Sequence, residues 1–223
     1  MPSVLYVVDR NMPSFGMARL SADVVCAGDS ITGWNNFGTV DGWPYRTYPE
    51  FLQGLCEPGG LRIANGGIAG EISANGLGQV EDYLDLFPNA RFFVVGYGTN
   101  DLGMWPEVER TSPRIIGNLD GIVRAIREGA RWPILLNVPS ANESMFFRSM
   151  AEDLRRMRHY HNGRLAAYCM EGRIPLVDIA SKLQDEHFGD ELHPNDEGAQ
   201  IIAQEVFRVL NELRMAERRD DPS

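Results

Sequence analysis

Residues 24–33 have the sequence Val24-Val25-Cys26-Ala27-Gly28-Asp29-Ser30-Ile31-Thr32-Gly33, and this stretch decides the fold. The apolar run predicts a short buried strand, and Gly28 permits a sharp bend directly after it. In an open α/β sheet, ligands bind at the carboxyl ends of the strands, where Asp29 and Ser30 would lie. Ser30 is therefore a candidate nucleophile. A lone Gly-Asp-Ser is also ordinary turn chemistry, and by itself it favours that simpler interpretation.

The rest of the chain alternates short apolar runs with stretches of helical spacing. Further strands are expected at residues 61–65, 92–95, 134–138 and 174–179, and helices at 46–55, 76–87, 112–129, 150–171 and 195–213. This alternation is typical of one doubly wound domain, which we expect over residues 23–213, as a three-layer α/β/α fold with a five-stranded parallel sheet in the order 2-1-3-4-5.

The two ends of the chain carry weaker signals. Residues 1–22 form an extension of unclear structure, in which residues 5–8 could be an edge strand, an oligomer contact or a loosely attached arm. Residues 214–223 are charged, and we expect them to fray. The oligomeric state is not predictable from these features.

Composition restricts the partners. The net charge of −10 and the pI of about 4.9 argue against nucleic acid as a ligand. No apolar run approaches the roughly 18 residues that span a membrane, and the start of the chain offers no signal peptide. We therefore expect no membrane insertion and a cytoplasmic location. The three cysteines are far apart and form no C-x-x-C pair, so we expect buried thiols rather than metal ligands or disulfides.

Two further predicted strands end in turns with polar or glycine-rich sequences. Gly70 follows the second strand and Asn100 the third. Gly70 could be a simple turn residue or could present a bare backbone N–H to a cleft. Asn100 could cap the following segment or aim its side-chain amide at the same cleft. All three turns would lie on one edge of the sheet.

One histidine is distinguished from the other three by its neighbours. His193 has Asp190 three residues earlier and a proline directly after it, whereas His159 and His161 lie in an arginine-rich helix, which indicates a solvated face. His187 lies in an acidic loop and is expected to be exposed. A short loop can fold Asp190 against one imidazole nitrogen and leave the other free, which is the arrangement of carboxylate, base and nucleophile in a serine hydrolase.

Four short blocks follow one another along the sequence: Gly28-Asp29-Ser30, Gly70, Gly98-Thr99-Asn100-Asp101 and Asp190-Glu191-Leu192-His193-Pro194. Together they resemble the four blocks of the SGNH (GDSL) hydrolase superfamily, over about residues 24–210. Asn65 and Gly70 also match the Asn-x-x-x-x-Gly pattern of the second block. The resemblance implies a flavodoxin-like fold and esterase, thioesterase, lysophospholipase or carbohydrate O-deacetylase activity, with no metal or organic cofactor.

The resemblance also implies a role for each matched residue. Ser30 would be the nucleophile, His193 the general base and then the general acid, and Asp190 the group that orients the imidazole. The N–H groups of Ser30 and Gly70 and the side chain of Asn100 would form the oxyanion hole. Asp29 is instead expected to stabilise the turn by bonding backbone N–H groups.

The substrate is the least determined feature. Aromatic and methionine side chains in the loops suit both acyl chains and sugar faces, but they could equally pack against the core. The candidates for a substrate pocket are Trp34, Trp43, Met104, Trp105 and Phe146. We expect a small-molecule ester, with a short-chain or acetyl ester, possibly on a carbohydrate, ahead of a lysophospholipid or an acyl thioester. A non-catalytic binding module is the rival interpretation from another functional class.

Overall fold

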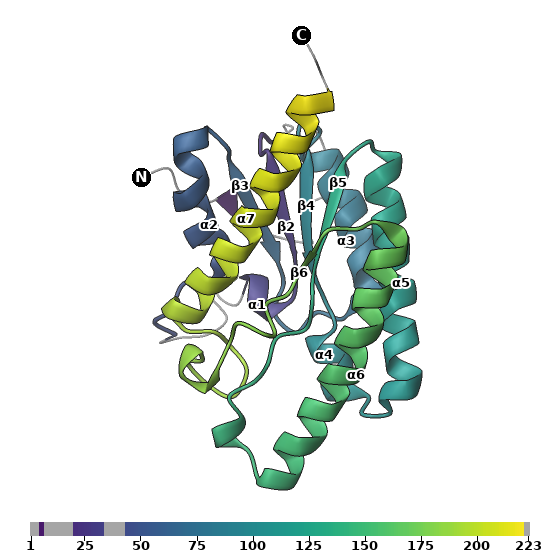
Figure 1. Ribbon diagram of the computed structural model, residues 1–223. Helices are drawn as coiled ribbons and strands as arrows, with labels where there is room; N and C mark the ends of the chain where they lie inside the picture. Colours follow the sequence, from purple (N-terminus) through teal and green to yellow (C-terminus); the bar gives the residue numbers. More distant parts are fainter. Residues whose placement is uncertain (1–4, 7–19, 34–42, 221–223) are drawn as a thin grey trace.

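The computed structural model describes residues 5–6, 20–33 and 43–220, and its centre is a parallel sheet (Figure 1). The strands are β1 (Leu5–Tyr6), β2 (Val24–Gly28), β3 (Ile63–Gly67), β4 (Phe92–Gly96), β5 (Trp132–Leu136) and β6 (Leu176–Val177). Their order is β1-β3-β2-β4-β5-β6, and every neighbouring pair is parallel. The predicted five-stranded order is confirmed in β3-β2-β4-β5-β6, and β1 adds a two-residue edge strand beside β3.

Helices cover both faces of this sheet (Figure 1). The helices of the described residues are α1 (Ser30–Gly33), α2 (Tyr48–Cys56), α3 (Ser73–Leu86), α4 (Thr99–Met104), α5 (Val108–Glu128), α6 (Arg148–Gly172) and α7 (Asp196–Asp220), with short 3₁₀ turns η1 (Glu57–Gly59), η2 (Glu143–Met145) and η3 (Asp185–His187). The arrangement is the predicted three-layer α/β/α fold.

Alternate residues of each central strand enter different cores. In β2, Val24 and Cys26 pack with residues of α2 and α7, whereas Val25 and Ala27 pack with residues of α3, α5 and α6. All four are fully buried. A parallel strand covered on both faces needs apolar side chains at every position, which explains why β2 is an unbroken apolar run.

The register aligns the carboxyl ends of the three central strands. Gly28 at the end of β2 pairs with Gly67 of β3 and with Gly96 of β4. A Cβ on Gly28 would lie 2.6 Å from the Gly96 carbonyl oxygen, so only glycine allows this close approach. The turns that carry Ser30, Gly70 and Asn100 therefore leave the sheet at one edge, as predicted.

Some element boundaries differ from the prediction. β6 is limited to two residues because the side-chain oxygen of Asn137 accepts the N–H groups of Ile179 and Ala180 and turns the chain away. α7 continues to Asp220, beyond the expected end at residue 213. Glu217 accepts a hydrogen bond from Trp132 and pairs with Arg91, and these contacts hold this part of α7 against the sheet.

Candidate active site

Ser30 is the first residue of α1 and directly follows the turn after β2. It is buried, with 3% of its surface exposed. The neighbouring Asp29 supports the turn, since its carboxylate accepts the Ile31 N–H at 2.9 Å, as the sequence predicted. Burial, and next the nearby Asp101 carboxyl group, raise the pKa of Asp29 to about 7. Asp29 thus belongs to the scaffold beneath the serine.

A series of hydrogen bonds joins three side chains that are distant in the sequence. The Nε2 atom of His193 lies 3.0 Å from Oγ of Ser30, and its Nδ1 atom lies 2.8 Å from Oδ2 of Asp190. The other carboxylate oxygen of Asp190 accepts the N–H groups of Leu192 at 2.8 Å and His193 at 2.6 Å. Burial opposes ionisation of Asp190, but these N–H donors and the imidazole together lower its pKa. The carboxylate is therefore ionised and fixed in orientation.

The loop before α7 holds the imidazole in this position. Phe188 and Pro194 form an isolated antiparallel bridge, and the Gly189 N–H donates to the His193 carbonyl oxygen at 2.9 Å. The ring of Trp43 packs edge-on against the imidazole, with 5.8 Å between the ring centroids. Backbone and aromatic contacts thus restrict the histidine from two sides.

Three N–H donors lie in the turns at this edge of the sheet. Gly70 is exposed and has a φ of +77°, a left-handed conformation that favours glycine. Neither its N–H nor that of Ser30 donates to any described residue. The Asn100 amide donates one hydrogen to the Glu71 carbonyl oxygen at 2.7 Å, and no described residue accepts the other. Preorganised donors of this kind are what an oxyanion hole requires.

Buried polar side chains tie these turns to the helices beneath them. The Glu71 carboxylate accepts the Gln79 amide at 2.6 Å, and Gln79 in turn accepts the Tyr97 hydroxyl at 2.6 Å. Asp101 accepts both the N–H and the hydroxyl of Ser73, at the start of α3. Sequence reasoning assigned no role to Glu71 or Ser73. The one available signal for Glu71 was its position directly after Gly70.

A cavity of about 420 Å³ opens beside His193. Its wall combines an apolar part from α4 and α6 with the polar loop of the histidine. The lining residues are Thr99, Leu102, Gly103, Phe146, Leu154, Met157, Arg158, Asp190, Glu191, Leu192 and His193. The residues from α6 were not predicted, because a long polar helix gives no sign of which turn borders a cleft.

The predicted pocket residues lie in different surroundings. Phe146 lines this cavity, and Trp43 contacts His193 instead. Met104, the last residue of α4, does not line it and is 61% exposed. Trp105 does not line it either, since its ring packs under the guanidinium of Arg114 at 5.4 Å. Trp34 lies outside the described residues.

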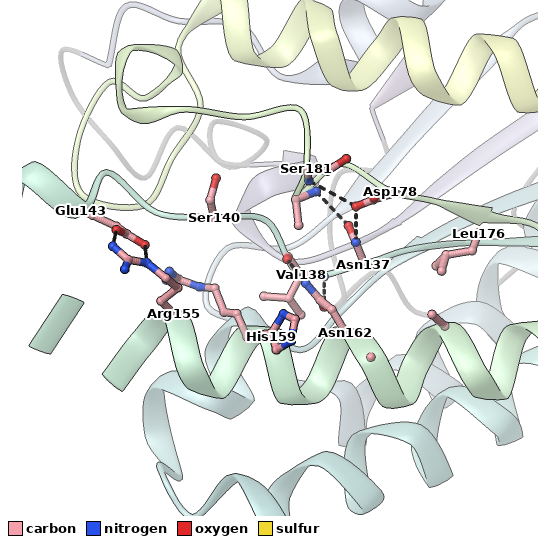
Figure 2. A pocket seen from close by; sticks show the side chains of 14 residues that line it. Asn137, Val138, Ser140, Glu143, Arg155, His159, Asn162, Leu176, Asp178 and Ser181 are labelled. Carbon is pink, nitrogen blue, oxygen red and sulfur yellow. Dashed lines mark hydrogen bonds and ion pairs between the residues drawn. The ribbon is translucent and has the colours of Figure 1, made fainter. Parts of the chain in front are cut away.

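A second cavity, of about 430 Å³, lies between α6 and the ends of β5 and β6 (Figure 2). On one side Asp178 accepts hydrogen bonds from Asn137 at 2.6 Å and from the Ser181 N–H at 3.2 Å. Burial opposes ionisation of Asp178, but the donors from Asn137 and Ser181 lower its pKa. Ser30 and His193 do not line this cavity, and Arg158 lines both cavities.

The prediction that the arginine-rich part of α6 faces solvent is wrong for two residues, His161 and Arg158. His159 is exposed as expected, but His161 is fully buried, with its Nδ1 atom 3.0 Å from Oγ of Ser112 on α5. Burial, and next the charge of Arg164, lower the pKa of His161 to about 4, so it is a neutral core residue. Arg158 is also buried, with 9% of its surface exposed. α5 packs against α6, which explains the burial of His161.

No group of three or more His, Cys, Asp or Glu side chains in residues 5–6, 20–33 and 43–220 could hold a metal ion. Over the same residues, no helix combines the length and the apolar character needed to cross a bilayer. The three cysteines are buried free thiols, as predicted.

Comparison with known proteins relates this geometry to a family. Residues 26–201 match the GDSL-like Lipase/Acylhydrolase family. A search of the curated proteins found no match.

Solved structures with the same fold include three with named activities or families. A carbohydrate acetylesterase from Sinorhizobium meliloti has a TM-score of 0.68 at 15% identity, over 86% of this chain and 99% of that one. An acetylxylan esterase from Geobacillus stearothermophilus, solved as a catalytic mutant, has a TM-score of 0.65 at 17% identity, over 86% and 96%. A GDSL-like lipase from Bacteroides thetaiotaomicron has a TM-score of 0.61 at 24% identity, over 85% and 88%. At these identities the likeness shows a shared fold.

Proposed function

The chain belongs to the GDSL-like lipase/acylhydrolase family, and from this premise we propose that Ser30, His193 and Asp190 hydrolyse a carboxylic ester through an acyl-serine intermediate. The protein is an ester hydrolase by family. The observation that supports the residue roles is the unbroken series of hydrogen bonds from Ser30 Oγ through both imidazole nitrogens to Asp190. A nucleophile, a base and an orienting carboxylate in that order are the requirements for acyl transfer to serine.

The first half of the reaction acylates the serine. As Oγ of Ser30 attacks the ester carbonyl carbon, Nε2 of His193 takes the hydroxyl proton, and Asp190 stabilises the imidazolium that forms. Negative charge develops on the carbonyl oxygen, where the N–H groups of Ser30 and Gly70 and the Asn100 amide would donate to it. His193 then returns the proton to the departing alkoxide, and the acyl group stays on Ser30.

The second half releases the acid. Water replaces the alcohol, and His193 removes a proton from it as its oxygen attacks the acyl carbon. The tetrahedral intermediate collapses, and the proton on His193 passes to Oγ of Ser30 as the bond to the acyl group breaks. The carboxylic acid leaves, and the hydrogen bond between Ser30 and His193 is restored for the next cycle.

The proposed substrate is a short-chain ester, with an acetyl ester on a carbohydrate as the leading candidate. The cavity beside His193, about 420 Å³, is near the lower end of the usual range for small-molecule sites. Its polar and apolar walls suit a compact ligand that is not purely hydrocarbon. Two proteins of the same fold are named as acetylesterases that act on carbohydrates.

A substrate panel tests both the reaction and the substrate class. We would measure kcat/KM on 4-nitrophenyl acetate, butyrate, octanoate and dodecanoate, and on an acetylated xylo-oligosaccharide, a lysophospholipid and an acyl thioester. The proposal expects the highest values on the acetyl esters. A maximum on dodecanoate with lysophospholipid turnover, or on the thioester, would replace it with the corresponding alternative on the same catalytic residues.

The Ser30→Ala variant is the control for the mechanism. It should lose hydrolysis and should no longer be labelled by a fluorophosphonate probe, while its circular dichroism and Tm stay close to those of the wild type. Equal turnover in the wild type and the variant would contradict Ser30 as nucleophile, and no turnover of any ester by the wild type would favour a non-catalytic binding module.

A further inference from the structure

Arg158 is a buried cation at the wall of the cavity beside His193. It is nine-tenths buried, and its Nη1 atom is inaccessible to solvent and has no hydrogen-bond partner among the described residues. No described carboxylate lies within ion-pair distance of its guanidinium. It nevertheless borders the same open space as the imidazole of His193.

The acidic groups near Arg158 are already engaged by other residues. Glu143 attracts Arg158 electrostatically, but its carboxylate pairs with Arg155 at two positions, as Figure 2 shows. Asp190, which lines the same cavity, accepts hydrogen bonds from the imidazole and two N–H groups. The charge of Arg158 is therefore not neutralised by a direct contact with the described chain.

A buried charge without a partner is unfavourable for folding, and proteins ordinarily pair it. Burial lowers the pKa of Arg158, but an arginine side chain stays charged at neutral pH. Such a cation is more readily explained when its partner is a ligand that is present during function. Arg158 lines both cavities, but of the two it is the one beside His193 that borders the proposed catalytic residues, so a ligand bound to Arg158 there would be the substrate.

We propose that Arg158 binds a carboxylate of the substrate, so that the natural substrate is an ester that also carries a free carboxylate group. This inference rests on the proposed ester hydrolysis at Ser30. A planar guanidinium can bind a carboxylate side-on through two parallel hydrogen bonds from Nε and Nη2, and a ligand would use these two nitrogens because Nη1 is inaccessible to solvent. The apolar residues Leu102, Phe146, Leu154 and Met157 would contact the carbon skeleton between the carboxylate and the ester.

A carboxylate fits the charges of the cavity better than a phosphate does. Among the described lining residues, Arg158 is the one with a permanent positive charge, whereas Asp190 and Glu191 are acidic. A phosphate monoester carries close to two negative charges at neutral pH and usually needs several cations or N–H donors. A single arginine in a cavity that also contains two carboxylates favours an anion with a single charge.

Matched substrate pairs test the proposal, because one member of each pair has a free carboxylate and the other has the same group as an uncharged methyl ester. One pair carries the carboxylate on the acyl side, as 4-nitrophenyl hydrogen glutarate and its methyl ester. The other carries it on the alcohol side, as 4-acetoxybenzoate and its methyl ester. In the wild type, kcat/KM should favour the acid in at least one pair by about 10- to 100-fold, the size expected for a charge-assisted hydrogen bond. Arg158→Gln should reduce that ratio to about one, and Arg158→Lys should retain part of it.

Arg156→Gln is the matched control, because Arg156 lies on the same helix, is exposed, and borders neither cavity. This variant should keep the wild-type ratio. A wild-type ratio near one in both pairs, or a ratio that Arg158→Gln leaves unchanged, would overturn the proposal even if the esters are hydrolysed.

A binding measurement separates this proposal from the hydrolysis on which it rests. Isothermal titration with glutarate should give binding in the wild type and in Ser30→Ala, at least about tenfold weaker binding in Arg158→Gln, and no binding of glutaramide. Glutarate binding without any ester turnover would contradict the proposed hydrolysis and leave Arg158 as an anion site. Tighter binding of inorganic phosphate than of glutarate, or equal glutarate binding by Arg158→Gln, would refute the carboxylate assignment.

Discussion

The Nδ1 atom of His193 lies 2.8 Å from Oδ2 of Asp190, while the second oxygen of the same carboxylate accepts two backbone N–H groups from Leu192 and His193. The carboxylate is thus held by its own loop before it meets the imidazole. With Asp190 accepting at Nδ1, the neutral imidazole carries its proton there, and Nε2 can accept the proton of Ser30.

This arrangement predicts a severe effect of Asp190→Asn. The amide oxygen would stay on the two N–H groups, so the amide NH₂ would face Nδ1 and force the imidazole to carry its proton on Nε2. That tautomer cannot accept the proton of Ser30. We expect kcat on 4-nitrophenyl acetate to fall by on the order of 10³- to 10⁴-fold with little change in Tm. A decrease of less than about tenfold would contradict the role of Asp190.

Asn100 provides a test of the oxyanion donors. Its amide bonds the Glu71 carbonyl oxygen with one hydrogen and would stabilise the transition state with the other. Asn100→Ala should lower kcat by on the order of 10²-fold or more, which corresponds to about 3 kcal/mol, with a smaller change in KM. Asn118→Ala is the control, since it removes a hydrogen bond to Ser73 in the same region without altering the turn. A similar loss in both variants would indicate a structural role for Asn100.

The layout of the site was predictable because the sheet itself brings distant turns together. Once β2, β3 and β4 are recognised as adjacent parallel strands, Ser30, Gly70 and Asn100 must leave at the same edge. His193 and Asp190 were distinguishable because they are three residues apart in one loop. Local spacing and sheet topology are both visible in a sequence.

The cavity wall was not predictable, because α6 violates the usual correspondence between polarity and exposure. Arg158 and His161 are polar and lie near exposed His159, yet both are buried. Charged residues are rarely enclosed, so a helix rich in arginine is normally expected to face solvent. Met104 and Trp105, which the sequence places in a loop, have no periodicity from which the direction of their side chains could be inferred.

The buried carboxyl group of Asp29 predicts an unusual dependence of stability on pH. Its pKa is raised from 3.8 in the unfolded chain to about 7 in the folded protein. The folded state therefore binds this proton more tightly than the unfolded chain does. The stability that protonated Asp29 contributes is fully present below pH 3.8 and is lost as the pH rises through about 7. The variant Asp29→Asn cannot ionise at this position and does not lose this stability. The difference in the free energy of unfolding, variant minus wild type, should therefore increase by up to about 4 kcal/mol between pH 4 and pH 7.5. Urea unfolding at several pH values measures this difference, and a difference that is constant with pH would be contrary to expectation.

A final prediction follows from the unpaired charge of Arg158. Removing this charge should increase the stability of the protein and abolish its preference for carboxylate-bearing esters. Arg158→Met keeps a long, flexible side chain among Leu154 and Met157 but removes the buried cation. Because an uncompensated buried charge opposes folding, we expect the free energy of unfolding to rise by about 1–3 kcal/mol, and Tm by several degrees. The same variant should lose the preference for carboxylate-bearing esters. Arg156→Met, at an exposed position of the same helix, should change neither property appreciably. A lower Tm for Arg158→Met would mean that the arginine stabilises the free protein, which would remove the argument that its missing partner is the substrate.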